Sequence, residues 1–79
     1  MWIRSQDKDM VVDVNSLCID FDCSEREFVI KGFEKTCCRG EWCNLGFYSN
    51  ATNAEKALTV VCEKFESEFI IQMPQEEEV

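Results

Sequence analysis

Histidine is absent from this 79-residue chain, and proline and glycine are rare, with one and three residues. Without histidine, a serine or cysteine nucleophile has no imidazole base beside it. The three glycines, Gly32, Gly40 and Gly46, are too widely spaced to form a phosphate-cradling loop. The composition therefore argues against catalysis, and we expect a protein that is not an enzyme and holds no cofactor.

Basic residues are also few, since eight lysines and arginines stand against 16 aspartates and glutamates, for a formal net charge of -8. They are scattered along the chain, whereas nucleic-acid binding needs a cluster that neutralises phosphates. We therefore expect no nucleic-acid partner. The acidic surplus has two readings: a plain solvated surface, or an acidic face that docks on a basic protein.

Long apolar runs are missing, because none approaches the roughly 20 residues that cross a bilayer. Residues 1–8 contain no basic segment followed by an apolar stretch, as a secretory leader would. We therefore expect a cytoplasmic protein without membrane contact. The length suffices for one small domain, which we place at residues 1–74, with residues 75–79 as a disordered acidic tail.

Cysteine is abundant by contrast, with six residues. In a reducing cytosol such residues are mostly free and packed as small apolar side chains, and disulfides are the alternative. A structural zinc site normally uses paired short spacings, and the chain has no C-x-x-C pair. Metal is therefore expected to be absent. A thiol or metal role is kept as an outside alternative for Cys37, Cys38 and Cys43.

Alternating apolar residues predict several strands. Residues 10–14 and 17–23 read as a hairpin around Asn15-Ser16. In the second segment one set of side chains is assigned to the core face: Leu17, Ile19, Phe21 and Cys23. Asp20 and Asp22 lie on the opposite face, either as a solvated pair or as an acid–base or cation-binding pair.

Further strands are predicted at residues 27–31, ended by Gly32, and at residues 41–48, with a polar connection between them. Gly46 indicates a bulge or a close approach of another backbone. In an unbulged strand Trp42 and Phe47 would point to opposite faces.

A single helix is predicted from Thr52, whose side chain and Glu55 form a capping box, to about residue 66. Its apolar stripe contains Ala54, Ala57, Leu58, Val61, Cys62 and Phe65. We assign Cys62 to a reduced core on this basis. A last strand at residues 69–73 is stopped by Pro74. These elements predict an α+β fold, a mainly antiparallel sheet with one amphipathic helix on one face and a C-terminal strand.

The two ends of the chain carry a family resemblance. The opening Met1-Trp2-Ile3-Arg4-Ser5-Gln6-Asp7-Lys8, the stretches 45–49 and 54–58, and the closing Met73-Pro74 resemble small uncharacterised proteins from phages and prophages of Gram-positive bacteria. The resemblance implies a cytosolic phage-encoded accessory protein and supplies no active site. It does not extend to the cysteine-rich section between Cys18 and Cys43.

The residues nominated for partner binding are Arg4, Gln6, Lys8 and Trp42. The polar set after Ile3 offers hydrogen-bond donors and acceptors, although an ordinary turn explains it too. The leading hypothesis is a non-catalytic accessory protein that binds a host or phage protein. The alternative is an oligomer, such as a homodimer, that binds a nucleotide-like ligand at a subunit interface near Arg4 and Trp42.

Overall fold

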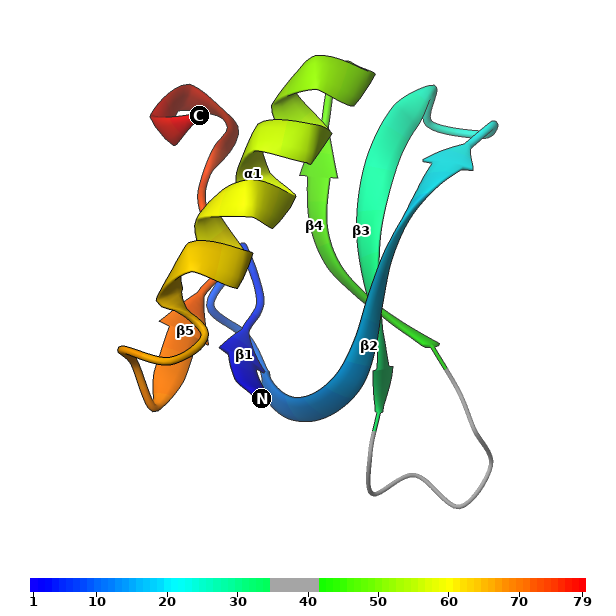
Figure 1. Cartoon of the computed structure of the whole chain (residues 1–79). Coiled ribbons are helices and arrows are strands. Elements are labelled where there is room, and N and C mark those ends of the chain that lie inside the picture. Colours follow the sequence, from blue (N-terminus) through cyan, green and yellow to red (C-terminus); the bar gives the residue numbers. More distant parts are fainter. Residues whose placement is uncertain (35–41) are drawn as a thin grey trace.

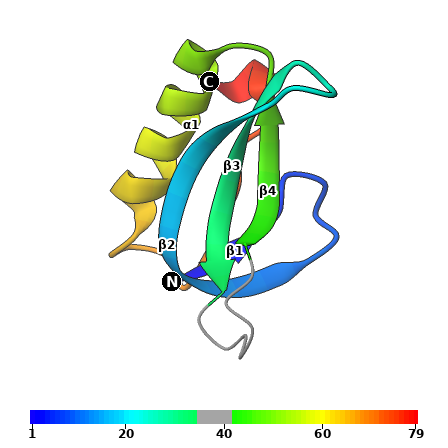
Figure 2. The ribbon, with the colours of Figure 1, turned by 90° about the vertical axis from the view of Figure 1, so that its right-hand side faces the viewer.

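The computed structural model describes residues 1–34 and 42–79. In chain order the elements are β1 (Trp2–Arg4), β2 (Val11–Asp22), β3 (Glu27–Glu34), β4 (Trp42–Tyr48), α1 (Ala51–Lys64), β5 (Ile70–Gln72) and the short 3₁₀ helix η1 (Glu76–Glu78). The strands form one sheet in the order β4-β3-β2-β1-β5, and α1 packs on one face (Figures 1 and 2). Among the described strands, the β1–β5 pair is parallel and the other three pairs are antiparallel. The predicted α+β fold is confirmed.

The predicted hairpin around Asn15-Ser16 is wrong, because β2 runs through both residues as one strand. Val14 pairs with Glu34 and Ser16 with Phe33, so the extra residue forms a β-bulge. The two segments lacked the glycine that most two-residue hairpin turns require. The bulge leaves the apolar residues on both sides of it on the same face of the sheet, which we call the inner face because α1 covers it.

The core lies between α1 and this inner face. Its buried side chains come from every strand and from α1: Ile3, Val12, Val14, Ile30, Leu45, Tyr48, Ala54, Ala57, Val61, Ile71 and Met73. The sequence had predicted that Gly32 ends this strand, and this prediction is wrong, because β3 continues through Gly32 to Glu34. A Cβ atom there would lie 2.6 Å from Val14 Cγ1, so the strands can approach only because this side chain is absent.

The predicted bulge near Gly46 is confirmed. The pairing shifts between Ile30–Gly46 and Lys31–Asn44, which places one extra residue in β4. A Cβ on Gly46 would lie 2.9 Å from Met73 Cγ. The bulge also brings Trp42 and Phe47 to the same outer face, instead of the opposite faces expected of an unbulged strand.

The helix starts slightly earlier than predicted and buries a narrower stripe. Asn50 is the N-cap, and its side chain accepts a hydrogen bond from the Asn53 N–H, so the capping box at Thr52 is wrong. Ala54, Ala57 and Val61 form the buried line of contact, whereas Cys62 is exposed. The placement of Cys62 in the core is therefore wrong. The small alanines let α1 pack closely on the sheet along one narrow line, and helix residues beside that line stay exposed to solvent.

Residues 75–79 differ from the predicted disordered tail. They include η1, and one Glu76 carboxylate oxygen accepts hydrogen bonds from the Ser49 N–H and hydroxyl, both at 2.6 Å, and from the Asn53 amide at 2.9 Å. These hydrogen bonds lower the pKa of Glu76. The acidic composition predicted a solvated segment. The sequence could not reveal the hydrogen bonds that hold residues 75–79, because their donors lie far away along the chain.

Candidate binding surface

Gln6, nominated for partner binding, is occupied inside the protein. Its side-chain amide donates to the Phe47 carbonyl at 3.1 Å and accepts from the Phe47 N–H at 2.9 Å, as a neighbouring strand would. Its backbone N–H donates to the Leu45 carbonyl at 2.7 Å. Gln6 therefore covers the outer edge of β4 and joins it to the segment that follows β1.

The C-terminal segment makes further hydrogen bonds to the same region around Gln6 and β4. The Tyr48 hydroxyl donates to the Pro74 carbonyl at 2.6 Å, and Gln75 donates to the Gln6 carbonyl at 2.6 Å. Burial, followed by the charges of Glu76 and Glu78, raises the pKa of Tyr48, so this donor stays protonated. We call this hydrogen-bonded region, from Gln6 through β4 to Pro74, the closed side.

The other nominated residues are exposed but not assembled into one site. Arg4 lies on β1, and Lys8 lies in a turn with a positive φ of 65°. That turn is held by the buried Ser5, whose hydroxyl donates to Asp7 and accepts from the Met10 N–H. The ordinary-turn interpretation of this polar set thus describes Ser5 and Asp7 well.

Trp42 lies at the opposite end of β4 from Phe47, on the outer face. It is 47% exposed and packs edge-on against Phe33 with ring centroids 5.1 Å apart. It adjoins residues 35–41, which lie outside the described part of the chain. Gln6 caps the far end of this strand, so the structure does not bring these two nominated residues together.

The cysteine and aspartate hypotheses gain no assembled site. Cys37 and Cys38 lie outside the described residues, and Cys43 donates to Glu34 at 3.7 Å. Cys18, Cys23 and Cys62 carry free thiols, and Cys23 is exposed instead of lying on the core side as predicted. Within residues 1–34 and 42–79, no three histidine, cysteine or acidic side chains are grouped as metal ligands.

A hollow of about 510 Å³ lies on the outer side of α1. Its lining comes from the helix and the last residue of the chain: Thr52, Glu55, Lys56, Thr59, Val60 and Val79. It contains none of the nominated residues. We do not regard it as the main surface, because five of its six lining residues belong to a single helix face.

A second, apolar surface lies between α1 and β2. Three side chains of β2 lie on the inner face beyond the bulge, next to Phe28 of β3: Leu17, Ile19 and Phe21. Leu17 and Ile19 are only partly buried. Phe21 is 46% exposed and packs edge-on against Phe28, with ring centroids 5.1 Å apart. Val14, on the other side of the bulge, is fully buried. Burial of the inner face thus falls along β2 toward its C-terminal end.

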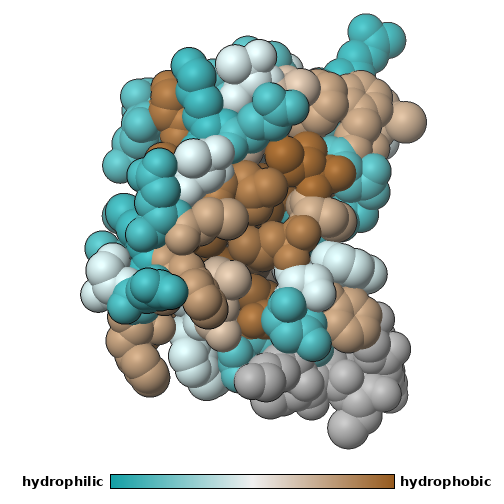
Figure 3. Space-filling model, viewed as in Figure 1, coloured by the Kyte–Doolittle hydropathy of each residue, from teal (hydrophilic) through white to brown (hydrophobic). Residues whose placement is uncertain are grey.

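The helix borders this surface on the other side. Leu58 is partly buried against the core, on the side of α1 opposite Val60, which faces the C-terminal Val79. That side faces β2 and β3 in Figure 1, and Figure 3 shows a continuous apolar band there. We define the open strip by its residues: Leu17, Ile19, Phe21, Phe28 and Leu58.

The open strip follows from the ratio of helices to strands. A helix is about 10–12 Å across and strands lie about 4.8 Å apart, so one helix cannot cover the whole width of a five-stranded sheet. Here α1 contacts β3, β4 and β5. Among the described residues, the inner face of the C-terminal half of β2 is only partly covered. Alternation in the sequence had assigned its apolar residues to the core and could not reveal this exposure.

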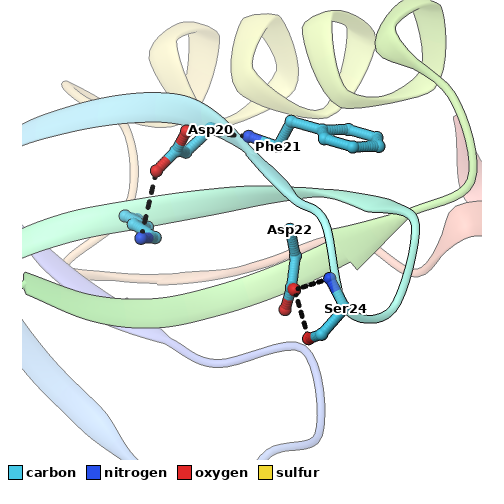
Figure 4. A network of polar contacts seen from close by, with 5 residues as sticks. Asp20, Phe21, Asp22 and Ser24 are labelled. Carbon is cyan, nitrogen blue, oxygen red and sulfur yellow. Dashed lines mark hydrogen bonds and ion pairs between the residues drawn. The ribbon is translucent and has the colours of Figure 1, made fainter.

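The edge of β2 beside the open strip is also unpaired. β1 pairs with β2 only at residues 11–13, and the Val14 N–H donates to the Met1 carbonyl. From Asn15 to Asp22, β2 pairs with β3 on one side and with no described strand on the other. The Phe21 N–H donates to its neighbour Asp20 Oδ1 at 2.8 Å and not to a strand (Figure 4).

Carboxylates line the outer face next to this edge. Asp22 lies directly opposite Glu27, and Lys31 Nζ contacts Asp20 Oδ2 at 3.2 Å. Hydrogen bonds from the Phe21 N–H and then Lys31 lower the pKa of Asp20, and bonds from Ser24 and the Glu25 N–H lower that of Asp22. Both aspartates are therefore charged at neutral pH. They are held as single strand residues and not as an acid–base pair.

Comparison of the chain with family models, curated proteins and solved structures finds no match. No helix in the described residues is long and apolar enough to cross a membrane.

Proposed function

We propose that this protein is a non-catalytic binding module whose contact surface for another protein is the open strip. The observation that supports this proposal is the run of half-buried apolar side chains between α1 and β2, ended by the exposed ring of Phe21. Aromatic side chains supply much of the binding energy at protein interfaces. An apolar strip with a polar rim is the form that such interfaces take.

Charge favours a basic partner. The net charge of -8 disfavours nucleic acid and attracts positively charged proteins over a distance. Asp20, Asp22 and Glu27 place negative charge beside the open strip, with Lys31 as the neighbouring cation on that face. The apolar strip would supply affinity, and the carboxylates would speed association and select the partner.

The biological setting remains part of the proposal. The terminal stretches that resemble phage and prophage proteins of Gram-positive bacteria support an accessory role in the host cytoplasm, with a host or phage protein as the partner. An accessory protein of this kind acts by occupying a surface of its target. It needs no catalytic group for that role.

The chain offers a matched pair of residues for the test. Phe21 and Trp42 are 46% and 47% exposed, and each packs edge-on against a β3 phenylalanine at 5.1 Å, on opposite faces of the sheet. We expect immobilised wild-type protein to retain a specific protein from a Gram-positive host lysate. Phe21→Lys should abolish this retention and Trp42→Lys should preserve it. Circular dichroism of both variants checks folding.

Two results would contradict the proposal. Absence of any retained protein at both low and moderate salt would argue against a binding role. Loss of retention only in Trp42→Lys would move the contact surface to the outer face, where the sequence had nominated that tryptophan.

A further inference from the structure

The unpaired edge of β2 indicates the form that a segment bound at the open strip takes. Successive residues of a strand direct their backbone N–H and C=O groups to opposite edges. The Phe21 N–H is turned away from β3, toward Asp20 Oδ1. Leu17 and Ile19 share the phase of Phe21, so their backbone groups also point to the free edge. An apolar side-chain strip and a row of strand hydrogen-bonding groups therefore lie side by side.

A helix placed in the strip would cover the side chains but leave this edge without partners. An extended segment satisfies both features, because its backbone pairs with β2 while alternate side chains lie on the inner face. Those inward side chains would lie between Ile19 and Leu58, in an apolar environment. Nearer the N-terminal end of β2, the same edge already pairs with a strand, because β1 pairs with Val11–Asp13.

The outer face specifies the remaining side chains of the segment. Its outward residues would lie beside Cys18, Asp20 and Asp22 of β2. Like charges directly opposite each other destabilise a sheet, as do Asp22 and Glu27 here, whereas opposite charges stabilise it. Lysine or arginine at the outward positions would relieve this repulsion. A second copy of the chain would instead bring its own Asp20, Asp22 and net charge of -8 to the same place.

We propose that the free edge of β2 at residues 15–22 accepts an extended segment of a basic protein as an added strand, with apolar residues inward and lysine or arginine outward. This inference rests on the proposed function and adds the conformation and residue pattern of the bound segment. Asp20, which caps the Phe21 N–H in the unbound protein, gives up that hydrogen bond when the strand adds. The same cap keeps the free edge from pairing indiscriminately.

The test uses wild-type protein and synthetic peptides of roughly nine residues, long enough to span the free edge. The first alternates lysine with valine, and a control contains the same residues as one block of lysines and one of valines. Two further peptides are alternating but N-methylated, one at every valine and the other at every lysine. Binding is followed by NMR of the labelled protein up to millimolar peptide.

We expect the alternating peptide to bind and the block peptide not to bind. The amides of Leu17 and Ile19 should become protected from hydrogen exchange, and the Phe21 amide should shift. Methylated valines block antiparallel pairing and methylated lysines block parallel pairing. One methylated peptide should therefore bind roughly tenfold or more weakly, since several backbone hydrogen bonds are lost, while the other binds like its parent.

The remaining outcomes separate the inference from the proposed function. If the alternating peptide binds at the open strip and both methylated forms bind equally well, strand addition is overturned and the binding surface stands. If no strip amide responds while lysate retention still depends on Phe21, the inference again fails alone. If neither experiment detects binding, both fail. A dimer in light scattering that protects Leu17 and Ile19 would assign the edge to a second copy and overturn the inference.

Discussion

The closed side and the open strip are built on the same sheet, yet they differ in how their polar and apolar groups are covered. On the closed side, Gln6 pairs with the edge of β4 and Tyr48 reaches the Pro74 carbonyl. Beside the open strip, the edge of β2 pairs with no described strand, and Asp20 caps the Phe21 N–H there. The comparison shows that every strand contributes to the buried core, whereas the C-terminal part of β2 keeps its apolar side chains only partly covered.

The largest effect on the free energy of unfolding should come from creating a cavity in the buried core. Ile71 is fully buried on β5, whereas Ile19 is only partly buried in the open strip. Ile71→Ala should lower the free energy of unfolding by about 2–5 kcal/mol, because it leaves a cavity, and Ile19→Ala by clearly less. Urea unfolding followed by tryptophan fluorescence measures both. Equal losses would show that the two sides are equally packed.

A second variant tests the close packing of β3 against Val14 and Leu45 at Gly32. Its Cβ would lie 2.6 Å from Val14 Cγ1 and 2.9 Å from Leu45 Cδ1. Gly32→Ala should therefore cost about 1–3 kcal/mol of unfolding free energy by overpacking. In a Val14→Ala background the same change should cost less, since the nearest methyl is gone. An unchanged cost in that background would show that this contact is not the cause.

The hydrogen bonds of the closed side should contribute less to the free energy of unfolding than the core does. Gln6→Leu removes both hydrogen bonds to Phe47 and leaves its N–H and C=O unpaired, which should cost about 1–2 kcal/mol. Faster hydrogen exchange of the Phe47 amide is expected along with a lower urea midpoint. Gln75→Leu, which removes the hydrogen bond to the Gln6 carbonyl, is the milder control. If the Phe47 amide exchanged at its wild-type rate, Gln6 would not be closing the edge.

The smallest effect concerns the C-terminal turn and depends on pH. Hydrogen bonds from Ser49 and Asn53 hold the pKa of Glu76 below its ordinary value of 4.5. The unfolded chain therefore binds this proton first, and the stabilisation is present above pH 4.5 and lost as pH falls through the lower folded-state pKa. Wild type should exceed Glu76→Gln in melting temperature near neutral pH, with the difference shrinking below about pH 4.5. A difference that does not shrink at all on acidification would show that Glu76 is not the titrating group.

Local sequence patterns predicted the fold class and most strands, because alternation and helical periodicity are properties of neighbouring residues. The bulge at Gly46 was visible for the same reason. The hairpin at Asn15-Ser16 was misjudged, since a bulge and a turn both interrupt alternation. The exposure of Cys62 was also misjudged, because a stripe on a helix does not tell how wide the surface beneath it is.

Composition and periodicity alone indicate an acidic α+β domain without histidine chemistry, with an apolar face on β2 and a single helix to cover it. They do not reveal that α1 lies over β3, β4 and β5, that Gln6 closes one edge, or that Phe21 is exposed beside an edge of β2 that no described strand pairs. These features depend on contacts between residues far apart in the chain. Periodicity states which side chains share a face, and packing alone decides which part of that face is covered.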